Sequence, residues 1–321
     1  MLKVVVITQG LSRIVQPLIK NNCCQIVGII ESSARVDSES FRHSLRFRFV
    51  KILHRILFKR QINLLRFCRE IKIPYILMTK FNSSAVYKWL AQLQPDLIVV
   101  YSMSQLLSPE FIRIPSKGII NLHPSYLPDY RGPNPEFWQY YDTVLNPGVT
   151  VHYIDRGEDT GDIIEQERVS VLLGSRSSDQ LDLLIGSVGA RLLLKVVEDI
   201  AKNKVSKRPQ PTKTTTKRAR NLTAPEHNKI VDWNSWSIER VWHLMRGTEG
   251  WLDLVEQPKG IFSGQRWVVG EYEHSPTDAR EYGTVKNEFG YRLITRNGVI
   301  HLSIEFSIKR MLLRMLQYKL K

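Results

Sequence analysis

Short β-rich runs alternate with helix-length segments along the first hundred residues, and this alternation constrains the fold more than any other feature. Leu2 to Ile7, Gln25 to Ile30 and Asp96 to Tyr101 are strand-like, and Ser12 to Lys20 has helical character. A β-α-β order predicts a parallel sheet covered by helices. No G-x-G-x-x-G sequence follows the first run, which disfavours a dinucleotide site. We therefore expect an α/β fold with an open, mostly parallel, Rossmann-like sheet and helices on both faces.

Two strand-like runs between Gly118 and Asp162 end in polar residues. One run stops at Asn121-Leu122-His123, and the other stops at Asp155. Alternation along a strand places Asn121 and His123 on one side and Leu122 on the other. An imidazole exchanges protons near neutral pH, and an amide can donate to a developing oxyanion. With a carboxylate from the second loop, these groups suit transfer of an acyl-level group, although a histidine at a strand end is also a common structural residue.

The same stretch resembles the 10-formyltetrahydrofolate-dependent formyltransferases. Their pattern is an Asn-x-His-x-Ser strand end, then Leu-Pro, then Arg-Gly, and finally a loop with Asp-Thr/Gly-Gly. This chain has these elements in the same order, as Asn121-Leu122-His123-Pro124-Ser125, Leu127-Pro128, Arg131-Gly132 and Asp159-Thr160-Gly161.

The resemblance implies transfer of a formyl group from 10-formyltetrahydrofolate to a primary amine, without a metal. It implies a catalytic trio of Asn121, His123 and Asp159, in which Asp159 supports the imidazole and helps to remove the amine proton. By position in the two loops, the residues implied to hold the folate are Gln105, Leu106, Leu107, Asp155, Gly157 and Glu158. Ser125 and Arg131 are implied to bind the acceptor, with Arg131 suited to a phosphate.

A basic amphipathic helix is predicted from Phe41 to Phe67, within a chain of formal net charge +15. Its apolar residues recur at helical spacing, and its basic residues fall on another face. Three interpretations are open: a helix docked on the core with a solvated face, a helix on an anionic membrane surface, and a face that binds RNA or polyphosphate.

The chain divides into a predicted catalytic domain over residues 1–203, with the basic insertion at about 35–70, a linker over 204–225 and a C-terminal domain over 226–321. Short strand signals with glycine turns predict a small β-barrel-like C-terminal domain. A second basic amphipathic helix ends the chain. Asp232-Trp233 and Arg246 resemble the start of the C-terminal region in methionyl-tRNA and sugar formyltransferases.

The cysteines and the N-terminus favour a cytoplasmic protein. The three cysteines form neither a disulfide framework nor a metal-ligand spacing. The first apolar run is too short for a signal peptide. A peripheral position at a membrane follows only if the basic helix lies on lipid.

The acceptor is open at this stage. The stretch Pro133 to Tyr141 departs from the Ala-Ala-Pro-Ile pattern of methionyl-tRNA formyltransferases, and their Pro-x-Gly-Arg-Gly-Lys loop is missing after Ile30. Tyrosine and tryptophan near the site suit stacking on a sugar or a nucleobase. We therefore favour a nucleotide-linked amino sugar, with initiator methionyl-tRNA as the alternative. Two other functions are open, namely a formyltetrahydrofolate hydrolase and an inactive binding protein of the same fold. The protein could also form an oligomer.

Overall fold

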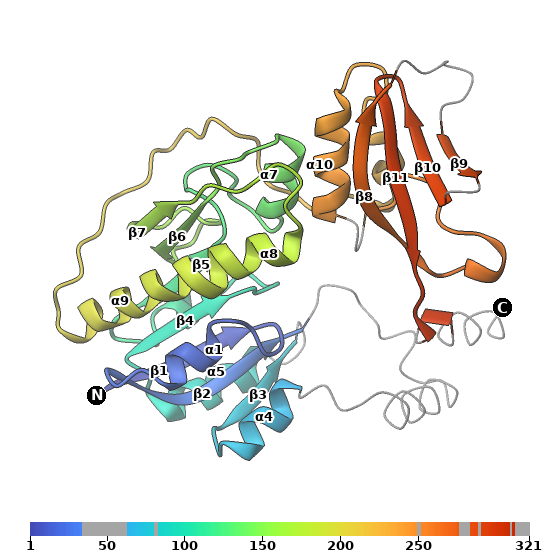
Figure 1. Cartoon of the computed structure of the whole chain (residues 1–321). Coiled ribbons are helices and arrows are strands. Elements are labelled where there is room, and N and C mark those ends of the chain that lie inside the picture. The colour runs from blue at the N-terminus through green and yellow to red at the C-terminus, as the bar shows by residue number, and fades with distance from the viewer. Residues whose placement is uncertain are drawn as a thin grey trace.

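Two β-sheets organise the chain in the computed structural model (Figure 1). The structure describes residues 1–33, 63–79, 83–248, 252–275, 283–287, 290–308 and 310–311. Most of the basic helix predicted for Phe41 to Phe67, and nearly all of the basic helix predicted at the C-terminus, lie outside these residues.

The larger sheet has seven strands in the order β3-β2-β1-β4-β5-β6-β7. The first five pair in parallel, and β6 and β7 run antiparallel to their neighbours. The predicted open, mostly parallel sheet is therefore confirmed. The strands are β1 (Leu2–Thr8), β2 (Cys24–Ser32), β3 (Tyr75–Met78), β4 (Leu97–Tyr101), β5 (Ile119–His123), β6 (Gly148–Tyr153) and β7 (Ile163–Arg168).

Helices cover both faces of this sheet, as predicted. One face packs against α1 (Val15–Ile19), α4 (Leu64–Glu70) and the long helix formed by α8 (Ser177–Leu181), a π-helical stretch (Asp182–Gly189) and α9 (Ala190–Ala201). The other face packs against α5 (Ser83–Leu93) and α6 (Pro109–Ile112). The central strands β1 and β4 are apolar on both faces, and both of these faces are buried, as is usual for parallel sheets.

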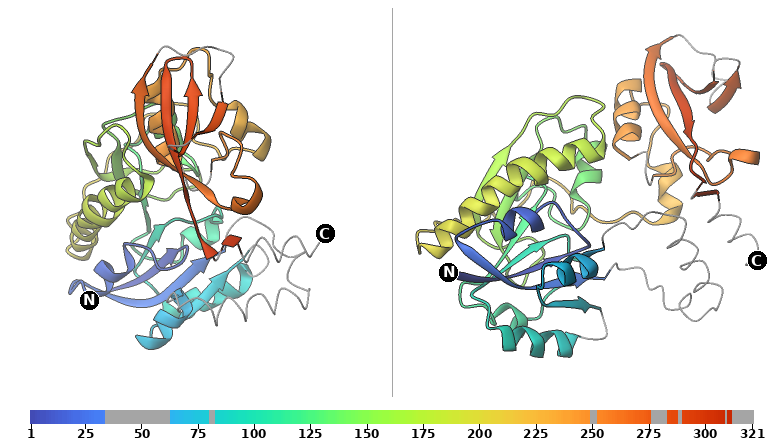
Figure 2. Two further views of the ribbon diagram at one scale, coloured as in Figure 1. Left: turned by 45° about the vertical axis from the view of Figure 1, so that its right-hand side comes forward. Right: turned by 60° about the horizontal axis from the view of Figure 1, so that its bottom comes forward.

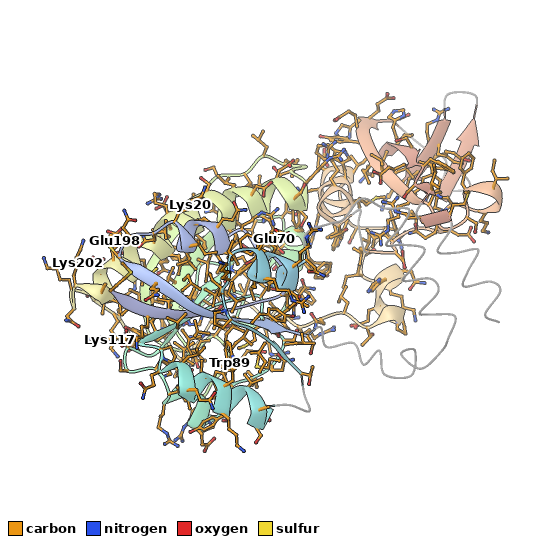
Figure 3. All side chains as sticks on the ribbon, turned by 90° about the horizontal axis from the view of Figure 1, so that it is seen from below. Lys20, Glu70, Trp89, Lys117, Glu198 and Lys202 are labelled. Atoms are coloured by element: carbon orange, nitrogen blue, oxygen red, sulfur yellow. The ribbon has the colours of Figure 1, made fainter. Side chains whose placement is uncertain are left out.

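Close packing of α5 on the sheet depends on a glycine in β2. A Cβ atom at Gly28 would lie 2.6 Å from the Trp89 ring, so only glycine leaves room for this indole. Trp89 is labelled on α5 in Figure 3, where charged side chains such as Lys20, Glu198 and Lys202 lie on the outer surface.

The second sheet is antiparallel, with four strands in the order β8-β11-β10-β9. It confirms the small C-terminal β domain, and the described residues form an open sheet. The right-hand view of Figure 2 shows it set apart from the larger sheet. Its elements are α10 (Ile238–Thr248), β8 (Arg266–His274), β9 (Gly283–Asn287), β10 (Gly290–Thr295) and β11 (Gly298–Glu305), with short 3-10 helices at Ala224–Lys229 and Gly260–Phe262.

A shared apolar core joins the two units through α7 (Pro135–Tyr141). Phe137 and Tyr140 of α7 are buried together with Val241 and Trp242 of α10. A Cβ atom at Gly247 of α10 would lie 2.3 Å from the Tyr140 ring, so the helices meet at van der Waals distance.

The predicted linker follows the surface of the catalytic unit before it reaches α10 (Figure 1). Arg208 forms an isolated antiparallel bridge with Ile163 at the start of β7. Farther along, the Ala219 N–H donates to the Arg131 carbonyl at 2.7 Å, and the Asn134 N–H donates to the Ala219 carbonyl at 2.9 Å. The linker therefore lies against the loops that follow β5. Within the described part of the chain, no helix is both long enough and apolar enough to cross a membrane.

Candidate active site

The predicted trio meets where β5 ends. Asn121 and His123 project from the same side of β5, and Leu122 points into the opposite core. Asp159 arrives from the loop between β6 and β7. Its Oδ1 lies 3.5 Å from Asn121 Nδ2, and its Oδ2 lies 3.7 Å from His123 Nδ1. The other ring nitrogen of His123, Nε2, donates to the Tyr130 carbonyl at 3.1 Å. Each nitrogen of this imidazole therefore faces an oxygen.

Asp159 is held in position by its backbone as well as by its carboxylate. Its φ is +54°, in the left-handed region that non-glycine residues seldom adopt. The Gly132 N–H donates to Oδ2 at 2.9 Å, and the Gln210 amide donates to the Asp159 carbonyl at 3.0 Å. Residues with unfavourable backbone angles that persist in this way are concentrated at functional sites.

His152 is a residue of this site that our sequence reasoning missed. It lies in β6 directly opposite Asn121 and is 1% exposed. Its Nδ1 donates to the Tyr153 carbonyl at 2.8 Å, so Nε2 is left to accept from Asn121 Nδ2 at 3.2 Å. Burial lowers the pKa of His152, with the Asp159 carboxylate acting against this shift. A neutral His152 therefore orients the amide of Asn121. The period-2 pattern of Val149 to Ile154 could have indicated its position.

An open cavity of about 210 Å³ contains the trio. All six residues predicted to hold the folate line this cavity together with the trio, from two loops on either side of Asn121. They are Gln105, Leu106 and Leu107 after β4, and Asp155, Gly157 and Glu158 after β6.

Several of these six residues are fixed by contacts within the protein. The Gln105 carboxamide accepts from the Ser32 hydroxyl at 2.6 Å. The Asp155 carboxylate accepts from the Gly157 N–H and from the Thr160 hydroxyl. Arg218 of the linker binds Glu158 through two nitrogens, one of them at 2.7 Å. Gln105 and Glu158 are thus held by residues outside the cavity lining, whereas Asp155 fixes its own loop from within.

The two residues predicted to bind the acceptor are placed differently. Ser125 is 0% exposed, and its hydroxyl donates to the Asp129 carbonyl at 2.6 Å. The Arg131 guanidinium donates to the Gln210 side chain at 2.7 Å and to the Pro211 carbonyl at 2.9 Å. Neither residue is among those that line the cavity. In this structure Arg131 holds the linker, and Ser125 holds the turn after β5.

The aromatic residues near the site also serve the protein itself. The ring centroids of Trp138 and Tyr141 in α7 are 5.3 Å apart, and those of Tyr141 and Trp236 are 5.0 Å apart. Arg240 of α10 stacks on Trp236 at 3.6 Å. These rings therefore pack between α7 and the C-terminal unit. Their placement does not support the expectation that they stack on an acceptor.

A second residue that sequence reasoning missed is Glu136, in the first turn of α7. It lines the same cavity as the trio, and among the described residues its buried Oε1 has no hydrogen-bond partner. Burial raises the pKa of Glu136 to about 7, although the Arg13 charge acts in the opposite direction. The sequence carried no signal for this residue, since a glutamate after proline is common in the first turn of a helix.

The loop that carries Asp159 depends on Gly161, which gives our first prediction. A Cβ atom there would lie 2.0 Å from the Tyr153 carbonyl oxygen. We expect Gly161→Ala to lower the free energy of unfolding by about 2 kcal/mol or more, because the backbone must move. Gly186→Ala is the control, since the nearest atom there is 3.3 Å away in the flexible Arg13 side chain. Its effect should stay within about 1 kcal/mol in urea unfolding. Equal effects of both variants would contradict the prediction.

Comparisons with known proteins agree with this geometry. Residues 67–197 match the formyl transferase family. The methionyl-tRNA formyltransferase of Thermodesulfovibrio yellowstonii is 31% identical over 182 residues, which is 56% of this chain and 56% of that protein. The enzyme of the same name from Clostridium beijerinckii is 36% identical over 182 residues, or 57% of each chain. The match thus spans little more than half of the length of these relatives.

Solved structures resemble the chain over nearly its whole length. The N-formyltransferase from Helicobacter canadensis, described in complex with folinic acid and dTDP-3-aminofucose, has a TM-score of 0.58 and 14% identity. That comparison covers 95% of this chain and 100% of the other. The sugar 3N-formyltransferase WlaRD has a TM-score of 0.57 and 15% identity, covering 96% of this chain and 99% of the other. Residues 67–197 and the sequence relatives are thus similar to formyltransferases, and the solved structures show that a fold of this kind extends over nearly the whole chain.

Proposed function

We propose that this protein transfers a formyl group from 10-formyltetrahydrofolate to a primary amine. The observation that carries the proposal is the convergence of Asn121, His123 and Asp159 in one cavity. An amide donor, an imidazole and a carboxylate within hydrogen-bonding reach of one substrate position can stabilise charge and move protons.

Each member of the trio has a separate role in this proposal. Asn121 donates one amide hydrogen to His152, and its second hydrogen makes only a 3.5 Å contact with Asp159. That second hydrogen is therefore available to the formyl oxygen, where negative charge develops. His123 stabilises the same charge more strongly when it is protonated. Asp159 accepts a proton from the attacking nitrogen, directly or through a water molecule.

The loops on either side of Asn121 fit a reduced folate. Leu106 and Leu107 can cover an aromatic ring face, and backbone groups beside them can pair with the edge of a pterin. Asp155, Gly157 and Glu158 would close the opposite side. The donor supplies the formyl group when it is bound, and the residues of the chain orient it and exclude water. The folate compounds named with the two solved sugar formyltransferases support this assignment.

For the acceptor, we propose the amino group of a nucleotide-linked amino sugar. The support is the likeness to the two sugar formyltransferases over 95% and 96% of this chain, including the C-terminal sheet. Initiator methionyl-tRNA is the second candidate, because the curated relatives at 31% and 36% identity carry that name. We also propose a polyanionic partner for the basic segment from Phe41 to Phe67, either acceptor phosphates or an anionic membrane surface.

The acceptor can be tested directly. The protein is incubated with 10-formyltetrahydrofolate and, in parallel, with dTDP-3-aminofucose or initiator methionyl-tRNA, and the formylated product is measured by mass spectrometry. We expect formylation of the amino sugar to be at least about tenfold faster per enzyme, since a matched site discriminates by at least that factor. Faster formylation of methionyl-tRNA would overturn the choice of acceptor but not formyl transfer. Release of formate without either product would indicate a hydrolase.

A further inference from the structure

The cavity is lined from both faces of the larger sheet. Val100 and Leu107 belong to the core beneath α5 and α6. Tyr101 and Leu122 belong to the core beneath α1 and α9. Asn121 and His123 are on the α5 side, because alternation along β5 turns Ile120 and Leu122 toward α9. The cavity therefore has a second end, beside Tyr101, that the proposed folate residues leave uncovered.

Glu136 occupies this second end. Burial and the Glu136 carboxylate together raise the pKa of the Tyr101 and Tyr140 phenols, so both rings lie within its field. Arg13 is the cation that acts on Glu136. However, the Arg13 guanidinium is bonded to the Asp182 carboxylate. Glu136 is thus a half-buried residue of the cavity wall whose Oε1 is buried, and among the described residues it has no hydrogen-bonded cation.

The position of Glu136 in its helix does not explain this burial. Glu110 has the same position in α6, since both residues follow a proline at the start of a short helix and precede a phenylalanine. Glu110 is exposed, and its pKa is lowered by its own backbone N–H and by the Ser108 hydroxyl. A carboxylate can therefore interact with a helix N-terminus from the surface. Burying a carboxylate without a partner is costly, so burial at a cavity wall suggests a partner that arrives with a ligand.

We propose that Glu136 binds the ammonium group of the acceptor and removes the proton that makes its nitrogen unreactive. This inference rests on the proposed formyl transfer and assigns the amine to the end of the cavity beside Tyr101. The ammonium group gives one proton to the Glu136 carboxylate and becomes a neutral amine. The nitrogen then forms a bond to the formyl carbon, and the bond between that carbon and N10 of the folate breaks. The second proton of the nitrogen passes through Asp159 to N10, and Glu136 returns its proton to solvent.

The first test needs no turnover. Infrared pH-difference spectra of wild type and Glu136→Gln isolate the carboxyl band of Glu136, which titrates. Methylammonium chloride should lower the midpoint of this band by about one unit, because an adjacent cation favours the ionised carboxylate. Tetramethylammonium chloride, which has no N–H to donate, should lower it much less. An unmoved midpoint with methylammonium would overturn the proposal, whatever the activity of the protein.

The second test uses kinetics with whichever acceptor is formylated. Glu136→Gln should raise the KM for the amine by about tenfold or more, the scale of a lost hydrogen bond between charged groups. For the wild type, kcat/KM for the amine should rise through neutral pH as the Glu136 carboxyl ionises. The Glu136→Gln variant should not show this rise. The KM for 10-formyltetrahydrofolate should stay unchanged, since the residues proposed to hold this donor lie on other loops. Glu110→Gln is the matched control and should behave as wild type.

These results separate the two claims. If Glu136→Gln has the amine KM and pH profile of Glu110→Gln while the wild type formylates its acceptor, the role of Glu136 is wrong and the proposed function stands. If the wild type formylates neither acceptor, the proposed function fails, and the infrared midpoint alone decides whether Glu136 binds an ammonium group.

Discussion

Replacement of His123 or Asp159 with alanine is expected to lower turnover by at least about a hundredfold, the usual scale for loss of a positioned acid–base or oxyanion group. His123 is 4% exposed, and its Nδ1 lies 3.7 Å from the Asp159 carboxylate. The Asp155 and Glu158 carboxylates share the cavity with Asp159, but they are bonded to Thr160 and Arg218 and do not replace it at the formyl group. His152 is close, but its Nδ1 is committed to the Tyr153 carbonyl.

The measurement is single-turnover formation of formylated product at saturating donor and acceptor. His301→Ala is the control. His301 lies on β11, in the C-terminal sheet, where it pairs with Glu273 at the surface. Binding of reduced folate, followed by calorimetry, should weaken much less than turnover, which separates lost chemistry from lost folding. Turnover near that of the wild type in either variant would remove that residue from the proposed trio.

Glu136→Gln is expected to stabilise the protein at alkaline pH by on the order of 3 kcal/mol, relative to its effect at pH 4. Burial raises the pKa of Glu136 from 4.5 to about 7 in the folded protein. The folded state therefore binds this proton more tightly than the unfolded chain does. Stability is lost as pH rises from about 4.5 to about 7, and the loss persists above that range. Glutamine has no proton to lose, so the variant avoids this penalty.

This prediction is checked by urea unfolding of the wild type and the variant at pH 4 and pH 8. The difference between the two proteins removes the contributions of the other titrating groups. Glu110→Gln should show no gain at pH 8, because the pKa of Glu110 is lowered rather than raised. A pH-independent difference for Glu136→Gln would mean that Glu136 is not buried as an unpaired carboxylate.

The elements of the larger sheet could be predicted because their determinants are local. The strand-like run that stops at Asn121-Leu122-His123 predicts a strand, and the structure has β5 at Ile119–His123. Alternation also placed Asn121 and His123 on one side of β5. The formyltransferase pattern added Asp159, whose approach to β5 no local rule predicts.

What the sequence by itself determined was therefore the alternation of strands and helices that forms the larger sheet, and the placement of Asn121 and His123 on one side of β5. Tertiary structure alone decided what fills the space around the trio. Gln210 reaches the Asp159 backbone across 51 positions of the chain, and Arg131 contacts Gln210 across 79. In the sequence, Glu136 looks like an ordinary residue at the start of a helix. Its burial follows only from the packing of α7 between the two units. Patterns of period 2 or 3.6 report which face of an element is buried, whereas the partner of a polar group depends on which distant segments the fold brings beside it.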